Sequence, residues 1–215
     1  MNYNKHYAKL ADGYLDIYNK FLLPQIKIED DNLGCTDYDH RSIAAFRLLF
    51  HAEVEEFIEE AASTSLSNIS RMVENKERIK KDKLLKISLI VDFNNAQPKL
   101  LEIDKLTNEK KVYISSYNQG LIESINYIIS KAKKIIDRNN GIKERSLVQM
   151  LMIAGIDTDR VSAVDLQLFN EYGSIRGAVA HKSVSGAAVF EAPSSENNKA
   201  KTLLTSIRSI YGVKK

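Results

Sequence analysis

The sequence predicts an all-α fold, a single helical bundle in which one helix carries a motif and a flexible loop follows it. The chain of 215 residues contains only three prolines and nine glycines, so few segments are divided into short strands. Residues that favour helices are plentiful, and apolar side chains recur at intervals of three and four over most of the chain. The length predicts one domain over residues 1–215, with a core at about 37–211 preceded by an N-terminal helix and loop over 1–36.

Composition limits the classes of function. Hydrophobic residues make up 44% and charged residues 27%, which is typical of a soluble globular protein. The formal net charge of +3 permits an anionic partner without requiring one. Cys35 is the single cysteine, which excludes an intramolecular disulfide and a thiolate metal cluster. The N-terminus lacks an apolar leader and no apolar run approaches the roughly 18 residues that span a bilayer, so we expect a cytoplasmic protein with no membrane contact.

Two helices are expected in the first third of the chain. One runs from about His6 to Leu23 and stops at Pro24, and a loop follows over residues 24–36. The next runs over about 37–62 and is expected to be the central helix of the bundle. Its apolar residues recur at three and four and mark a broad core-facing stripe, formed by Ile43, Phe46, Leu49, Phe50, Val54, Phe57, Ile58 and Ala61.

The central helix also carries His51 and Glu55, one turn apart among several glutamates. A catalytic zinc site needs three protein ligands, and neither His-Glu-x-x-His nor a pair of Glu-x-x-His motifs occurs in the chain. We therefore expect no metal, and we interpret the acidic side chains as a solvated helix face.

The middle of the chain is less regular. Residues 66–95 are charged in their middle and apolar toward their end, and they favour a helix whose charged part is exposed to solvent, with a phosphate-binding rim as the less favoured alternative. Residues 110–114 have the composition of a strand or an extended connector. A helix is expected over 119–137, and the basic residues near its C-terminus complement the helix dipole, which explains them without nucleic acid.

Three helices are expected in the last third. A short helix over 142–154 ends at Gly155, and a final helix over 196–211 packs back on the bundle. Between them a helix begins near Ser162, where Ser162 and Asp165 have the spacing of a capping box. The loop after this helix, over 182–195, is expected to be either a flap over a site or a flexible connector.

The helix that begins near Ser162 ends in the segment Arg176-Gly-Ala-Val-Ala-His181. Guanidinium stays cationic and binds phosphate oxygens, and imidazole moves a proton near neutral pH, so the pair suits phosphodiester chemistry without a metal. Five residues advance the two side chains to about 140° apart around a straight helix. Gly173 and Gly177 flank Arg176, and we expect the helix to end, bend or widen there so that both side chains reach one cleft.

Three features of the sequence carry a resemblance to a known family. They are the segment Phe46-Arg-Leu-Leu-Phe-His-Ala-Glu-Val-Glu-Glu-Phe57 in a long helix, Asn140-Gly-Ile-Lys143 ahead of a short helix, and Arg-x4-His near the C-terminus. Together they resemble the HEPN superfamily, and more narrowly its RiboL-PSP-HEPN-like domains, over about residues 40–210. Arg-x4-His and its setting are the specific part of the resemblance.

The resemblance implies a metal-independent endoribonuclease without a cofactor, with a composite site formed across a two-fold homodimer. Arg176 and His181 match the catalytic arginine and histidine of the family, and RNA is the implied substrate because the 2′-hydroxyl is the nucleophile. Relatives of this kind are linked to toxin–antitoxin and phage-defence systems, so an antitoxin or another defence protein is an implied partner. Lys182, Ser183 and Tyr172 lie close to the motif in sequence and are tentative substrate contacts.

Two alternatives remain open from the sequence. Active members commonly carry a polar residue directly after the arginine, whereas this chain has Gly177, which favours a catalytically silent HEPN module that dimerises or binds a nucleotide or RNA. Gly173, Gly177 and Ala180 also form a small-residue face that suits either a dimer interface or packing within the chain. Alternatively, Arg176 is a structural residue that pairs with an acidic neighbour, for which Glu171 and Glu56 are the candidates.

Overall fold

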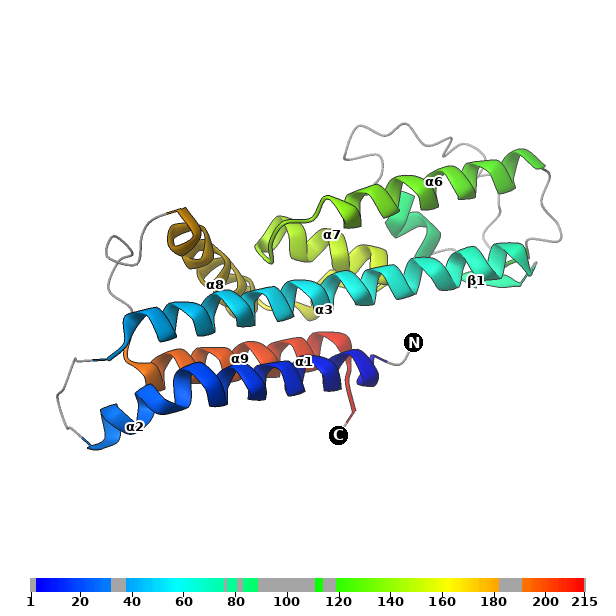
Figure 1. The fold of residues 1–215 in the computed structure, drawn as a ribbon. Helices are drawn as coiled ribbons and strands as arrows, with labels where there is room; N and C mark the ends of the chain where they lie inside the picture. Colours follow the sequence, from blue (N-terminus) through cyan, green and yellow to red (C-terminus); the bar gives the residue numbers. More distant parts are fainter. Residues whose placement is uncertain are drawn as a thin grey trace. The chain divides into compact units, whose positions relative to one another are not determined.

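The computed structural model describes residues 3–31, 38–75, 77–80, 83–88, 111–113, 119–181 and 191–214, and of residues 31, 78, 111–113, 119–121 and 175–181 it describes the backbone alone. The described chain is mostly helical (Figure 1), which confirms the all-α fold class. The elements in order are α1 Asn4–Ile17, the π-helical turn η1 Tyr18–Leu22, α2 Leu23–Asp31, α3 His40–Glu74, β1 Arg78–Lys80, β2 Lys111–Tyr113, α6 Gln119–Asp137, α7 Glu144–Ala154, the 3₁₀ turn η3 Thr158–Arg160, α8 Ala163–His181 and α9 Pro193–Tyr211.

The chain forms two compact units. Unit 1 contains residues 58–140 and 146–158, and unit 2 contains residues 2–57, 141–145 and 159–215. Helix α3 contributes residues 40–57 to unit 2 and 58–74 to unit 1. The sequence-based division, one domain with a core at about 37–211, stays a prediction.

The predicted helix stop at Pro24 is wrong, and so is the predicted loop over residues 24–31, because α2 continues the helix to Asp31. Residues 32–36 of that loop lie outside the described part of the structure. The π turn directly before Pro24 explains why the helix continues: the backbone N–H of Leu23 bonds to the carbonyl of Tyr18, five residues earlier. Such a widened turn relieves the clash between a proline ring and the carbonyl four residues before it.

Helix α3 begins at a cap formed by Asp39, whose carboxylate accepts from the backbone N–H of Arg41 (3.0 Å) and from the Ser42 hydroxyl (2.6 Å). It then runs for 35 residues, so the predicted end near residue 62 is wrong. Buried side chains recur every three or four residues along this part of α3, and their burial stabilises the helix through Ser63, Thr64 and Ser65. The buried residues are Ala61, Ala62, Ser65, Leu66, Ile69 and Val73. The apolar stripe predicted to face the core is confirmed except at Leu49, which is 43% exposed.

The helix expected over 66–95 is also wrong in its charged part. Strand β1 lies there and pairs antiparallel with β2, with Ile79 opposite Val112. Strand β2 confirms the extended segment predicted at 110–114. The Ile79 side chain is 1% exposed, and burying this single apolar residue gives the short ribbon a contact with the core that the charged pattern did not indicate. Residues 83–88 are helical.

Within unit 2, α1 and α9 lie side by side (Figure 1), and residues near the start of α1 contact residues near the end of α9. The Tyr7 hydroxyl donates to the carbonyl of Leu204 (3.2 Å), and the rings of Tyr3 and Tyr211 pack edge to face with centroids 5.3 Å apart. The core of this unit is rich in aromatic side chains, and four of them contact one another from α1 across α3 to α8: Tyr14, Phe46, Phe50 and Tyr172.

Within unit 1, α6 and α7 occupy the ranges predicted from the sequence to within two residues. The Asn139 side chain, after α6, donates to Glu59 on α3 (2.8 Å). Helix α7 ends at Gly155, which has φ +76°, and the amides of Gly155 and Ile156 bond back to the carbonyls of Met152 and Leu151. This is the Schellman arrangement that a glycine after a helix predicts.

Candidate functional site

The motif lies on α8, and a capping box starts this helix as predicted. The Asp165 carboxylate accepts from the backbone N–H (2.9 Å) and the hydroxyl (2.7 Å) of Ser162, and the Ser162 hydroxyl accepts from the backbone N–H of Asp165 (3.1 Å). Burial alone would raise the pKa of Asp165, but hydrogen bonds from Ser206 and Ser162 outweigh it and lower the pKa below its ordinary value. The capping box fixes where α8 begins.

Helix α8 continues without interruption from Ala163 to His181, through both Gly173 and Gly177. The helix end or widening that we expected at these glycines is therefore not found. On a continuous helix, positions 176 and 181 lie about 140° apart around the axis. The side chains of Arg176 and His181 lie outside the described part of the structure, so their predicted convergence stays a prediction.

Gly173 serves packing within the chain. A Cβ atom at this position would lie 2.9 Å from Cγ of Lys143 and 3.5 Å from Cγ1 of Ile142, so only glycine allows the present approach of α8 to the segment before α7. The backbone N–H of Glu144 donates to the Asn170 side chain (2.9 Å) at the same contact. Of the two uses predicted for the small-residue face, Gly173 takes the intramolecular one.

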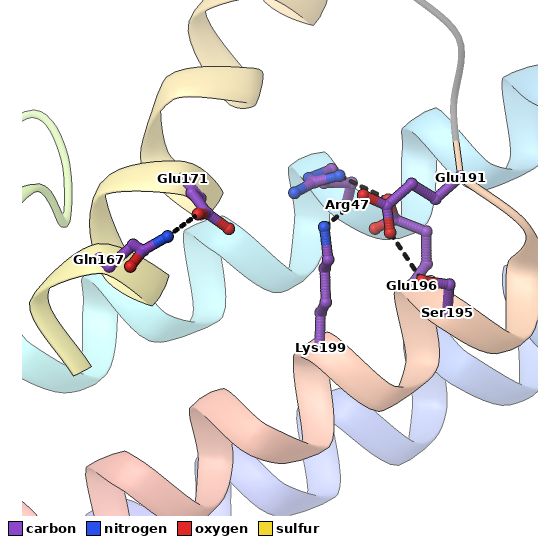
Figure 2. Close-up of polar contacts among 7 residues, drawn as sticks. All are labelled: Arg47, Gln167, Glu171, Glu191, Ser195, Glu196 and Lys199. Atoms are coloured by element: carbon purple, nitrogen blue, oxygen red, sulfur yellow. Dashed lines mark hydrogen bonds and ion pairs between the residues drawn. The ribbon is translucent and has the colours of Figure 1, made fainter. Parts of the chain in front are cut away.

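A buried polar cluster joins α8 to α3 and α9, and Figure 2 shows two of its members, Arg47 and Glu196. Arg47 on α3 donates through Nη1 to Glu196 Oε1 on α9 (2.5 Å), and the two side chains are 2% and 0% exposed. The guanidinium carbon of Arg47 lies 4.7 Å from the ring centroid of Tyr172, which is on α8 and 1% exposed. We call Arg47, Tyr172 and Glu196 the polar clamp, because these three residues join α3, α8 and α9.

Burial of the polar clamp costs free energy. Burial raises the pKa of Glu196, and the Arg47 guanidinium offsets only part of that rise. Among the described residues, Arg47 Nε and Nη2, Glu196 Oε2 and the Tyr172 hydroxyl have no hydrogen-bond partner. Desolvation of a buried ion pair costs several kcal/mol per ion, and a buried polar atom without a partner costs roughly 1–3 kcal/mol more. The clamp therefore adds little net stability to the fold.

A second, half-exposed group of polar residues borders the clamp (Figure 2). Glu191, just before α9, forms an ion pair with Lys199 and accepts from the Ser195 hydroxyl (2.6 Å). Hydrogen bonds from Lys199 and Ser195 lower the pKa of Glu191. This carboxylate therefore stays ionised at neutral pH beside the buried guanidinium of Arg47.

The polar clamp was not predicted from the sequence. Arg47 lies within the apolar stripe of α3, between Phe46 and Phe50, and a charged residue at such a position was the available signal. Glu196 is in the first turn of α9, where an acidic residue is usual because of the helix dipole, so its burial could not be foreseen.

The predicted site residues have different outcomes. Tyr172 is buried against Arg47, and this position favours packing over the predicted contact with substrate. Lys182 and Ser183, with most of the predicted loop over 182–195, lie outside the described residues, whereas residues 193–195 already belong to α9. Of the apolar side chains in the first turns of α8, Phe169 is buried but Val164 is 74% exposed.

The two acidic candidates for pairing with Arg176 have other partners. Glu171 accepts from the Gln167 side chain one turn earlier on α8 (2.8 Å; Figure 2), and Glu56 forms an ion pair with Lys9 (2.7 Å). Neither carboxylate needs Arg176 to be satisfied, which weakens the purely structural interpretation of that arginine.

His51 is buried on α3, with Nδ1 3.6 Å from Glu55 Oε2. Within the ranges that the structure describes, histidine, cysteine, aspartate and glutamate side chains do not gather in threes or more as metal ligands would. In the same ranges, none of the helices combines the length and apolarity needed to span a bilayer.

Comparison with known proteins gives one match. The family model described as RiboL-PSP-HEPN matches residues 14–210, a range that includes the polar clamp and all of α8. No curated protein and no solved structure matches the chain.

Proposed function

Because this chain belongs to the RiboL-PSP-HEPN family, we propose that it is a metal-independent endoribonuclease whose chemistry is carried by Arg176 and His181. The observation that carries the proposal is the position of the motif: Arg-x4-His ends a continuous helix, α8, inside the range that the family model matches. Both groups suit phosphodiester cleavage at neutral pH without a metal ion.

The proposed reaction uses the RNA itself as the nucleophile. His181 accepts the proton of the ribose 2′-hydroxyl, the 2′-oxygen attacks phosphorus, and the bond from phosphorus to the 5′-oxygen breaks as that oxygen takes up a proton. Arg176 holds the non-bridging oxygens, where negative charge builds in the transition state. The products are a 2′,3′-cyclic phosphate, hydrolysed in part to a 3′-phosphate, and a 5′-hydroxyl. DNA lacks the nucleophile and is expected to be inert.

We place the complete site across a homodimer. Positions 176 and 181 lie about 140° apart on an uninterrupted helix, so residues of one chain are not brought to one side by the helix itself. A second copy of α8 facing the first supplies an arginine and a histidine from the opposite direction. We further propose a cytoplasmic toxin or phage-defence effector, with an antitoxin or another defence protein as partner, supported by the family resemblance.

The same helix geometry, together with Gly177, favours a second candidate. In this alternative the chain is a catalytically silent module that dimerises and binds RNA or a nucleotide. Gly177 stands where active members commonly have a polar residue, so a contact to the substrate is missing.

Cleavage of a mixed RNA pool in EDTA separates the two candidates. Wild type, Arg176→Ala and His181→Ala are compared, with the exposed residues Lys201→Ala and His40→Ala as controls that remove the same kinds of side chain elsewhere. The proposal expects cutting by wild type and both controls, with cyclic-phosphate or 3′-phosphate ends, and loss of cutting in both motif variants. If all five proteins are inert while wild type is a folded dimer that retains RNA, the silent module replaces the ribonuclease.

A further inference from the structure

We infer that the polar clamp of Arg47, Tyr172 and Glu196 is a positioning device, which fixes the rotation and height of α8 and thereby the place of the motif at its C-terminal end. The inference rests on the proposed function for its catalytic consequence. Its structural content, that the clamp holds α8, stands on the geometry alone.

The clamp meets α8 one turn before the motif. Tyr172 precedes position 176 by four residues, so the two backbone positions follow each other on one side of the helix. The Tyr172 ring contacts two side chains of α3: its centroid is 4.7 Å from the guanidinium carbon of Arg47 and 5.6 Å from the ring centroid of Phe50. Glu196 holds that guanidinium from α9. A rotation of α8 by one residue would carry the ring about 100° away from both contacts.

The opposite contact of α8 lies at the same height. Gly173 touches Ile142 and Lys143, and Asn170 accepts from the backbone of Glu144. Residues 170–173 of α8 are thus held on two sides, whereas positions 176–181 follow as a continuation of the same rigid helix. The position of residues 176–181 is therefore set by the contacts of residues 170–173.

A contribution to the stability of the fold does not explain why these three polar residues are buried together. A buried ion pair with several unpartnered atoms is usually replaced by apolar residues without loss of stability, and the best-attested use of such pairs is to fix the register between elements. A cation stacked on a ring and joined to a carboxylate has one favoured geometry, whereas an apolar contact tolerates small shifts. Catalytic groups need this restriction, because a displacement of about 1 Å lowers a rate about a hundredfold.

The test replaces the ion pair by apolar residues of similar volume, Arg47→Met with Glu196→Leu. The matched control is Lys9→Met with Glu56→Leu, which makes the same change at an ion pair whose side chains are 53% and 52% exposed. Hydrogen exchange of the backbone amides of 173–181 is measured in each protein, and kcat and KM for RNA are measured in parallel.

In the clamp variant we expect exchange over 173–181 to be about tenfold faster than in wild type, with α1 and α7 unchanged. We expect kcat to fall about 10- to 100-fold while KM stays within about threefold, because the RNA-binding groups remain but their alignment is lost. The control variant is expected to match wild type in both measurements. Glu196→Gln keeps a hydrogen bond to Arg47, so its exchange rate and its kcat are expected to lie between those of wild type and those of the clamp variant. If the double variant does not fold, Glu196→Gln replaces it in the test.

The outcomes separate this inference from the proposed function. Unchanged exchange over 173–181 in the clamp variants overturns the inference, whatever happens to cleavage. Faster exchange in a protein whose wild type does not cut RNA supports the positioning role and removes the ribonuclease. Faster exchange with unchanged kcat overturns the catalytic consequence, because α8 would then move without effect on the reaction.

Discussion

Tyr14 joins the first helix of the chain to the last through one buried hydrogen bond. Its hydroxyl donates to Asn197 Oδ1 at 2.6 Å, and both residues are nearly inaccessible to water. Burial raises the pKa of Tyr14 to about 12. A folded pKa above the unfolded value means that this contribution is complete below about pH 10 and is lost as the pH rises through 12.

Tyr14→Phe is expected to lower the free energy of unfolding by about 1–3 kcal/mol, because the Asn197 side chain is left buried without this donor. Urea denaturation followed by far-UV circular dichroism measures the loss. Tyr127→Phe removes a hydroxyl from a side chain that is 39% exposed and is the matched control. Equal midpoints for the two variants would contradict the importance of the bond.

The capping box of α8 gives a prediction with a pH dependence. Ser162→Ala removes two hydrogen bonds and is expected to cost about 1 kcal/mol, or about 2–4 °C in Tm. The pKa of Asp165 is lowered in the folded protein, so its contribution is present above about pH 4 and lost as the pH falls through the folded value.

Thermal melts between pH 7 and pH 2 test this dependence. The difference in Tm between wild type and Asp165→Asn should be largest at neutral pH and should shrink toward zero in acid. A difference that stays constant with pH would show that the ionised carboxylate is not what stabilises the helix start.

At the scale of the elements, the sequence predicted helices well wherever apolar periodicity and end signals agreed. Helices α6, α7 and α9 and the capped start of α8 are of this kind. The errors at Pro24 and near residue 62 have a common physical reason: a local signal for a break was overruled by burial on both sides of it. Strand β1 could not be foreseen, because its pairing partner is more than thirty residues away in the sequence.

The end of α7 allows a direct comparison of two glycines. Gly155 has φ +76°, and Gly155→Ala is expected to destabilise the protein by about 1–2 kcal/mol because an L side chain is strained in this conformation. A Cβ atom added at Gly141 would meet nothing within 4 Å, and this glycine lacks a positive φ, so Gly141→Ala is expected to be neutral or slightly stabilising. Denaturant midpoints measure the stability of both variants. Equal losses of stability would contradict the claim that Gly155 is required for its positive φ.

At the scale of the whole molecule, the two compact units are interleaved in the sequence. Unit 1 takes residues 58–140 and 146–158 from the middle of the chain, unit 2 takes the rest, and α3 runs from one to the other without a break. The motif residues could be proposed from the sequence because their side-chain chemistry is local. The clamp was not, because it joins residues 47, 172 and 196, which only the fold brings together.

The interleaving leads us to expect one cooperative unfolding transition, in agreement with the prediction of a single domain. Neither unit is a continuous segment, so neither can unfold without disturbing α3 and the segment around residues 141–145. Far-UV circular dichroism and tyrosine fluorescence should give coincident urea midpoints, the latter because the chain has ten tyrosines and no tryptophan. Two separated transitions would show that the units are independent domains.

The pairing of α1 with α9 affects when the fold can be completed. The bond between Tyr14 and Asn197 spans 183 residues and that between Tyr7 and Leu204 spans 197, so the nascent chain cannot form them until α9 has been synthesised. Helix α8 leaves the ribosome before Glu196 is available to hold it. The contact between Arg47 and Glu196 therefore forms only after α9 has been synthesised, and α8 reaches its final position late in folding.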